Sequence, residues 1–140
     1  MNTMMPACNY AMLRFLPYPE TGEFVNVGVL VNCTEPCLLD FQMETEMPAR
    51  VKALFPQVDE NAFRDAAQAM QREMERLKCM VHDAKSCQLV FRETVRPRES
   101  VLRFSEIKTI LIPEPAALTE TLFRRYVRME PSQGTPLAGV

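Results

Sequence analysis

The sequence predicts an α+β domain, an antiparallel sheet of about five strands with its helices packed on one face. Alternating apolar residues predict strands in both halves of the chain, whereas apolar steps of three and four predict helices between and after them. Short connections between the first three strands favour antiparallel neighbours. The expected order is β-β-β-α-α-β-β-α in a single domain over residues 1–130, and residues 131–140, which contain proline and glycine, are expected to form a disordered tail.

The first two strands are predicted to form a hairpin with a stiff loop. Residues 10–16 form the first strand, and Pro17, Pro19 and Gly22 interrupt the pattern, because proline removes a backbone donor and fixes φ. The second strand, residues 23–31, would place four valines on one face: Val25, Val27, Val29 and Val31. Gly28 inside that strand indicates a bulge or a close backbone approach.

The remaining elements follow from spacing and from proline positions. A third strand is expected at residues 37–43, and helices at 48–55 and, after Asp59 as N-cap, from about residue 60 to 81. Two further strands are expected at residues 89–94 and 100–112, the second bulged near residues 105 and 106. The last helix is expected at residues 115–128.

Composition narrows the classes of function. The chain has 140 residues, 47% of them hydrophobic, and a formal net charge of −2, which gives no support to non-specific nucleic-acid binding. Its first ten residues lack a basic segment followed by an apolar one, and no apolar run is long enough for a membrane span, so neither a secretory signal nor a membrane span is expected.

The five cysteines are expected to be free thiols in a reducing compartment. The alternative is a zinc site formed by four of them together with the single histidine: Cys33, Cys37, Cys79, His82 and Cys87. The spacing departs from the usual two-residue knuckle, and buried thiols are commoner, so no metal is predicted. No cofactor is predicted either, because Gly22 and Gly28 stand alone and form no phosphate-binding loop.

The first candidate site is the end of the hairpin. A loop closed over residues 17–22 would bring Arg14, Glu23 and Asn26 together, where they could bind a partner loop, a carboxylate or a phosphate. The alternative is structural: Arg14 pairs with Glu23 across the strands, and Asn26 fixes the backbone of the loop. Asn26→Ala separates the two, since a purely structural role would leave partner binding intact.

The second candidate is a basic patch on the predicted late strands, formed by Arg92, Arg96, Arg98 and Arg103, with Lys108 nearby. Phosphate or RNA binding is one interpretation. The interspersed glutamates at 93, 99 and 106 favour the other, a self-neutralised surface exposed to solvent.

No catalytic residues are predicted. The single histidine, His82, has no serine or cysteine at the spacing of a known nucleophilic motif. A protein that acts by binding another protein is therefore favoured over an enzyme.

The hairpin resembles a bacterial family known as domain of unknown function 3037. The family motif is Tyr-x-x-x-Arg-Tyr/Phe-x-Pro followed by Gly-Glu-x-x-Asn-x-Gly, and here it falls on Tyr10, Arg14, Phe15, Pro17, Gly22, Glu23, Asn26 and Gly28. Genes of this family often lie beside genes for HipA-like serine/threonine kinases. The resemblance therefore implies a cytoplasmic protein that is an accessory or antitoxin-like partner of such a kinase, in a toxin–antitoxin or phage-defence setting. Two alternatives stay open: a nuclease or phosphoryl-handling enzyme that uses Arg14 and Glu23, and a homo-oligomeric adaptor.

Overall fold

The computed structural model describes residues 5–130, so the predicted tail at 131–140 lies outside the described residues. Three strands follow one another as a meander: β1 (Ala7–Phe15), β2 (Val25–Cys33) and β3 (Leu38–Met43). The other edge of β1 pairs with β4 (Leu102–Phe104) at one end and with β5 (Lys108–Leu111) at the other. The five-stranded antiparallel sheet that the sequence predicts is confirmed, with β1 at its centre.

Ser105 explains why the predicted strand at 100–112 becomes two strands. Its backbone N–H donates to the Met12 carbonyl at 2.8 Å, and its hydroxyl accepts a 2.8 Å hydrogen bond from the Met12 N–H. The hydroxyl thus replaces a backbone acceptor of the ladder, and the chain leaves the regular register between β4 and β5. The irregularity expected near residues 105 and 106 is confirmed.

A bulge in β2 reverses the expected alternation of the valines. Leu13 pairs with Gly28 whereas Arg14 pairs with Asn26, so Val27 is an extra residue without a partner on β1. Val29 therefore packs under α4, while Val25 packs with Phe15 on the opposite face. The prediction that all four valines share one face is wrong, because one inserted residue exchanges the two faces of a strand.

The helices are α1 (Ala49–Leu54), α2 (Glu60–Lys78), α3 (Ala84–Thr94) and α4 (Leu118–Leu122). A π-helical turn, η3 (Phe123–Val127), extends α4, and short 3-10 turns occur at η1 (Pro19–Thr21) and η2 (Pro115–Ala117). The predicted strand at 89–94 is wrong, since these residues lie in α3. Asp83 and Ser86 form a reciprocal capping box that starts this helix, and Cys87 and Phe91, four residues apart, are buried against the sheet.

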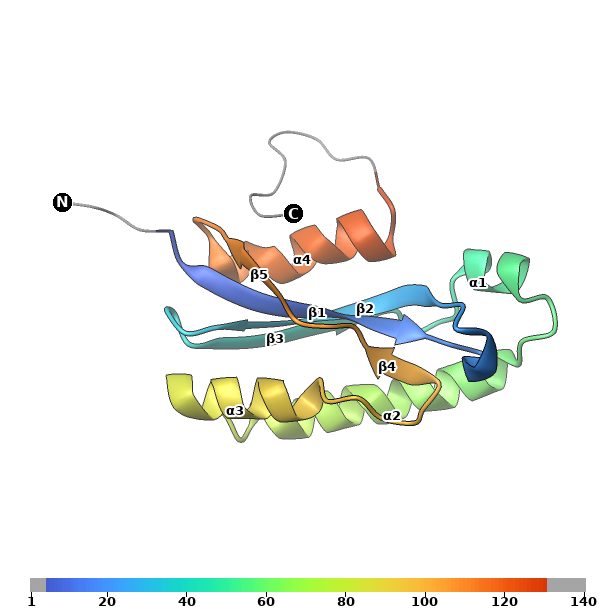
Figure 1. The fold of residues 1–140 in the computed structure, drawn as a ribbon, viewed down its shortest axis with the longest axis horizontal. Helices are drawn as coiled ribbons and strands as arrows, with labels where there is room; N and C mark the ends of the chain where they lie inside the picture. Colours follow the sequence, from blue (N-terminus) through green and yellow to red (C-terminus); the bar gives the residue numbers. More distant parts are fainter. Residues whose placement is uncertain (1–4, 131–140) are drawn as a thin grey trace.

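Helices cover both faces of the sheet, which corrects the expectation that they gather on one face. Figure 1 shows α2 and α3 below the sheet and α4 above it. The buried Leu118, Leu122 and Phe123 pack on Tyr10 and Val31 of the upper face. Most residues of β1 are buried, and they alternate between the two faces, so both faces have apolar residues that a helix can cover.

Two further observations bear on the sequence predictions. Cys8 and Cys33 lie opposite each other on β1 and β2, with their Cα atoms 4.5 Å apart, and form a disulfide; the expectation that all cysteines are free is therefore wrong. Among the helices of residues 5–130, none has the length and hydrophobicity that crossing a bilayer requires.

Candidate functional site

Arg14 and Asn26 face each other across β1 and β2, on the α4 side of the sheet. The guanidinium carbon of Arg14 lies 4.1 Å from the centre of the Phe24 ring, and this stacking fixes the plane of the guanidinium. Arg14 Nε and Asn26 Oδ1 are both buried, and neither has a hydrogen-bond partner in the described part of the chain. A buried donor and acceptor left unpaired are costly, so this position favours a bound group that pairs with them.

Arg50 of α1 contacts the backbone of Asn26. Its Nη2 donates a 2.7 Å hydrogen bond to the backbone carbonyl of Asn26. Burial lowers the pKa of Arg50, the carboxylate of Glu44 raises it, and the positive charge of Arg128 lowers it further. Arg128 Nε in turn donates to Glu44 Oε1 at 2.8 Å.

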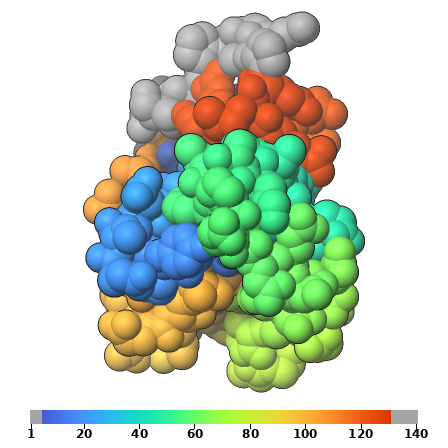
Figure 2. Space-filling model, turned by 90° about the vertical axis from the view of Figure 1, so that its right-hand side faces the viewer, coloured from blue at the N-terminus to red at the C-terminus, as the bar shows by residue number. Residues whose placement is uncertain are grey.

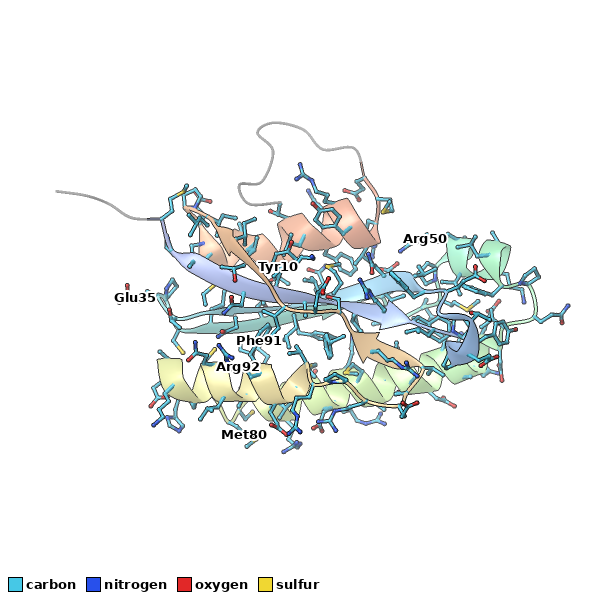
Figure 3. The ribbon with its side chains drawn as sticks, in the orientation of Figure 1. Tyr10, Glu35, Arg50, Met80, Phe91 and Arg92 are labelled. Atoms are coloured by element: carbon cyan, nitrogen blue, oxygen red, sulfur yellow. A yellow bond between two sulfur atoms is a disulfide. The ribbon has the colours of Figure 1, made fainter. Side chains whose placement is uncertain are left out.

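We call these residues the arginine cluster: Arg14, Asn26, Glu44, Arg50 and Arg128. In Figure 3, Arg50 lies on the α4 side of the sheet, between that helix and α1. The cluster holds three guanidinium groups and one carboxylate, and that carboxylate is already paired. Its net charge is positive, although the charge of the whole chain is −2.

The loop residues that the sequence singled out lie around this cluster but are not all part of it. Gly22 has φ of 77° and ends η1, and Pro17 is half-buried. Glu23 is exposed, and the ion pairs found within residues 5–130 include none between it and Arg14. The bulge places Gly28 against β3: a Cβ added there would lie 2.8 Å from Met43 Cβ. Gly28 is thus a point of close approach, as its place in a strand indicates.

A second candidate site is a groove between α2 and α3, closed at one end by β4. Its volume is about 590 Å³, and its apolar lining includes Met70, Met74 and Leu77. Met80 and Leu89 on its rim are 51% and 60% exposed. Figure 2 views the molecule from the α1 end, where α2 (yellow-green) and the segment before β4 (amber) lie side by side at the bottom. We call this feature the α2–α3 groove.

Only part of the predicted basic patch lines this groove. Arg96, Arg98 and Arg103 line it, whereas Arg92 is exposed on α3 and does not. Arg96 pairs with Glu93 at 3.0 Å, and Arg103 lies 3.5 Å from Glu99. The four residues come from a helix, a loop and a strand rather than from adjoining strands, because residues 89–94 are helical.

The cysteines and His82 do not converge on a metal site in the part of the chain that the structure describes. Cys33 is bonded to Cys8, while Cys37 and Cys79 are exposed. Cys87 is buried and accepts a 2.8 Å hydrogen bond from Asn32 Nδ2. Burial raises the pKa of the Cys87 thiol, which keeps it neutral and poorly nucleophilic.

Sequence reasoning missed Arg50, Glu44 and the α2–α3 groove. An arginine in a six-residue helix carries no local pattern that reveals its contact with Asn26. A signal for the groove was present, because Asp83 and Ser86 have the spacing of a helix cap and Cys87 and Phe91 that of a helix face.

Comparison with known families gives one match. The family model described as "Protein of unknown function (DUF3037)" matches residues 10–127. Comparisons with curated proteins and with solved structures gave no match. The matched segment includes Arg14, Asn26 and Arg50 as well as every residue of the α2–α3 groove.

Proposed function

We propose that this chain, which belongs to the family of unknown function DUF3037, is an interaction module whose α2–α3 groove binds an amphipathic helix of a partner protein. The observation that carries the proposal is an apolar groove between two helices with Met80 and Leu89 exposed on its rim. A helix with an apolar stripe fills such a groove, and methionine adapts its shape to the bound side chains.

The charges around the groove specify the partner further. Four arginines and two glutamates line it, so its electrostatic potential favours an acidic helix. Arg76 and Arg96 are held by Glu73 and Glu93, whereas Arg98 contacts only a backbone carbonyl among the described residues. The proposed occupant is therefore a helix with carboxylates beside its apolar stripe.

The family resemblance supplies one partner of this kind to test. It implies a HipA-like serine/threonine kinase, which this chain would dock on or restrain as an accessory or antitoxin-like subunit. Purification of this chain together with a HipA-like kinase from the same organism, followed by calorimetry on the isolated pair, tests the assignment. A kinase that does not bind the purified chain would remove this partner.

Leu89→Asp tests the groove itself, because a carboxylate on the rim would have to be buried when the partner helix docks. Partner affinity should fall at least tenfold, about 1.4 kcal/mol. The matched control is Leu54→Asp, which changes an equally exposed leucine of α1 and should leave the affinity unchanged. Equal affinity for Leu89→Asp and the unmodified chain would exclude the groove as the docking site.

The two alternative classes give different results with the purified chain alone. A homo-oligomeric adaptor would show a mass above one chain by light scattering, and Leu89→Asp would reduce it. A nuclease or phosphoryl-handling enzyme would consume nucleic acid or nucleotide, and Glu23→Gln would abolish that activity.

A further inference from the structure

A second ligand site, separate from the α2–α3 groove, follows from the arginine cluster. The strand register places Arg14 on the same face as Met12 and Tyr10, which pack under α4. The groove is on the opposite face, against α2 and α3. A ligand of the cluster would therefore not compete with a helix in the groove for space.

The cluster holds positive charge that the described residues do not neutralise. Glu44 has a side chain only 13% exposed and bonds Arg128 at 2.8 Å. Arg14 forms no ion pair within residues 5–130, and Arg50 contacts a neutral carbonyl. Partly buried guanidinium groups without a carboxylate partner are a favourable environment for an anion.

Asn26 connects the two arginines. Its backbone carbonyl accepts from Arg50, and its side chain lies opposite Arg14 with Oδ1 buried and unpaired. Rotation of the amide about its terminal bond would present its NH2 group instead, which would be a third donor group beside the two guanidiniums. Such a rotation would turn the unpaired acceptor into a group that contacts an oxyanion.

The arrangement favours phosphate over carboxylate. A planar carboxylate is satisfied by one guanidinium in a bidentate pair, whereas the tetrahedral oxygens of a phosphate accept donors that arrive from different directions. Arg14 is on β1 and Arg50 on α1, so the two guanidinium groups come from different elements. Three guanidiniums against one carboxylate also leave an excess positive charge close to the charge of a phosphate monoester at pH 7.

We propose that Arg14, Asn26 and Arg50 bind a phosphate group, either free or as a monoester on a small molecule, with Arg128 at the edge of the site. Arg14 Nε–H and Arg50 donate to the phosphate oxygens. Phe24 holds the Arg14 guanidinium in place from behind. The side chain of Arg128 is 53% exposed, so it can contact the phosphate from the solvent side.

Nuclear magnetic resonance of the arginine Nε–H groups tests the proposal directly. Sodium phosphate is titrated into the full chain at pH 7 against sodium chloride of equal ionic strength. The Arg14 Nε–H signal should shift saturably with phosphate and not with chloride. A signal that moves equally in both salts would overturn the site.

Variants assign the contacts. Arg14→Gln and Arg50→Gln should each weaken phosphate binding at least tenfold, and the two substitutions lie in different elements, so a folding defect in one leaves the other informative. Arg72→Gln, at an exposed arginine of α2, is the matched control and should bind like the unmodified chain. Unchanged affinity in both cluster variants would refute the proposal.

Two further comparisons test the electrostatics and identify the source of the phosphate. Glu44→Gln should tighten binding, because it removes the competing carboxylate and frees Arg128; weaker binding would contradict the charge argument. Titrations with adenosine monophosphate and with O-phosphoserine show whether a nucleotide or a phosphorylated amino acid binds better than free phosphate. Failure of these titrations leaves the groove proposal untouched, since Leu89 is on the other face.

Discussion

Gly28→Ala gives the sharpest test of how the bulge and the sheet fit together. The added Cβ would lie 2.8 Å from Met43 Cβ, 3.0 Å from the Gln42 carbonyl oxygen and 3.3 Å from Leu13 Cβ. Carbon atoms in contact normally lie about 3.5–4.0 Å apart, so one strand must move. Neither Met43 nor Gln42 can move without a loss of stability, because Met43 is buried and Gln42 is part of the β2–β3 ladder.

The expected cost combines two opposing effects. Overpacking of this kind costs about 1–3 kcal/mol. Alanine also restricts the unfolded chain more than glycine does, which raises the free energy of unfolding by about 0.4–1 kcal/mol. The net loss in the free energy of unfolding is about 1–2 kcal/mol, which lowers the melting temperature by about 3–6 °C in a domain of this size.

Gly22 provides the matched control, because it requires glycine for a different reason. Its φ is 77°, and no atom lies within 4 Å of a Cβ added there. Asparagine tolerates this left-handed conformation better than alanine, so Gly22→Asn should be milder than Gly22→Ala. At Gly28 the order should reverse, because asparagine is larger. Calorimetric melting of the four variants measures both orders, and a Gly28→Ala variant as stable as the unmodified chain would refute the close-approach argument.

Three other predictions concern stability and thiol chemistry. Replacing Cys8 and Cys33 together by alanine should lower the free energy of unfolding by about 3–4 kcal/mol in urea titrations under oxidising conditions, because the disulfide restricts the unfolded chain. A reductant should remove most of the difference in stability between this variant and the unmodified chain. Cys87 should react with iodoacetamide more slowly than the exposed Cys37, and equal labelling rates would contradict its burial as a neutral thiol. The neutral thiol of Cys87 should stabilise the fold fully below the ordinary thiol pKa, and this stabilisation should be lost as the pH rises through the raised pKa. Phe63→Ala should cost about 3–5 kcal/mol by urea unfolding, since its ring is fully buried 5.0 Å from that of Phe15; a loss below about 1 kcal/mol would show that the core refills the space.

The β-meander and the long helix could be read from the sequence because their periodicity is local. The features that were predicted wrongly depend on information other than the periodicity. Residues 89–94 include apolar and β-branched residues that are typical of a strand, and the helix is indicated only by the cap at Asp83 and the four-residue spacing of Cys87 and Phe91. The bulge at Val27 leaves the alternation of valines intact in the sequence, although it exchanges the faces in space.

The candidate sites also combine residues that local spacing brings together with residues that only the tertiary fold brings together. Arg14 and Asn26 could be singled out together because an antiparallel hairpin brings nearby residues opposite each other. Arg50 joins them only through its hydrogen bond from α1 to the Asn26 carbonyl in β2, which no local spacing reveals. The pairing of Arg14 with Glu23 was expected because both flank the loop, yet η1 and the exposed position of Glu23 keep the latter outside the cluster.

The strand pair β1–β4 is where the two proposed sites meet. Arg14 of the cluster lies directly opposite Arg103 in the β1–β4 ladder, so the two side chains leave the sheet on the same face, and Arg103, on the edge strand β4, also borders the α2–α3 groove. Two like charges opposite each other on neighbouring strands repel, so a phosphate that neutralises Arg14 would relieve part of that repulsion. Any coupling between the sites must be reciprocal: the factor by which phosphate changes affinity for the partner helix equals the factor by which the helix changes affinity for phosphate. Because the sites lie on opposite faces and share no residue, a measured coupling that survives Arg103→Gln would have to pass through the packed core rather than through this pair.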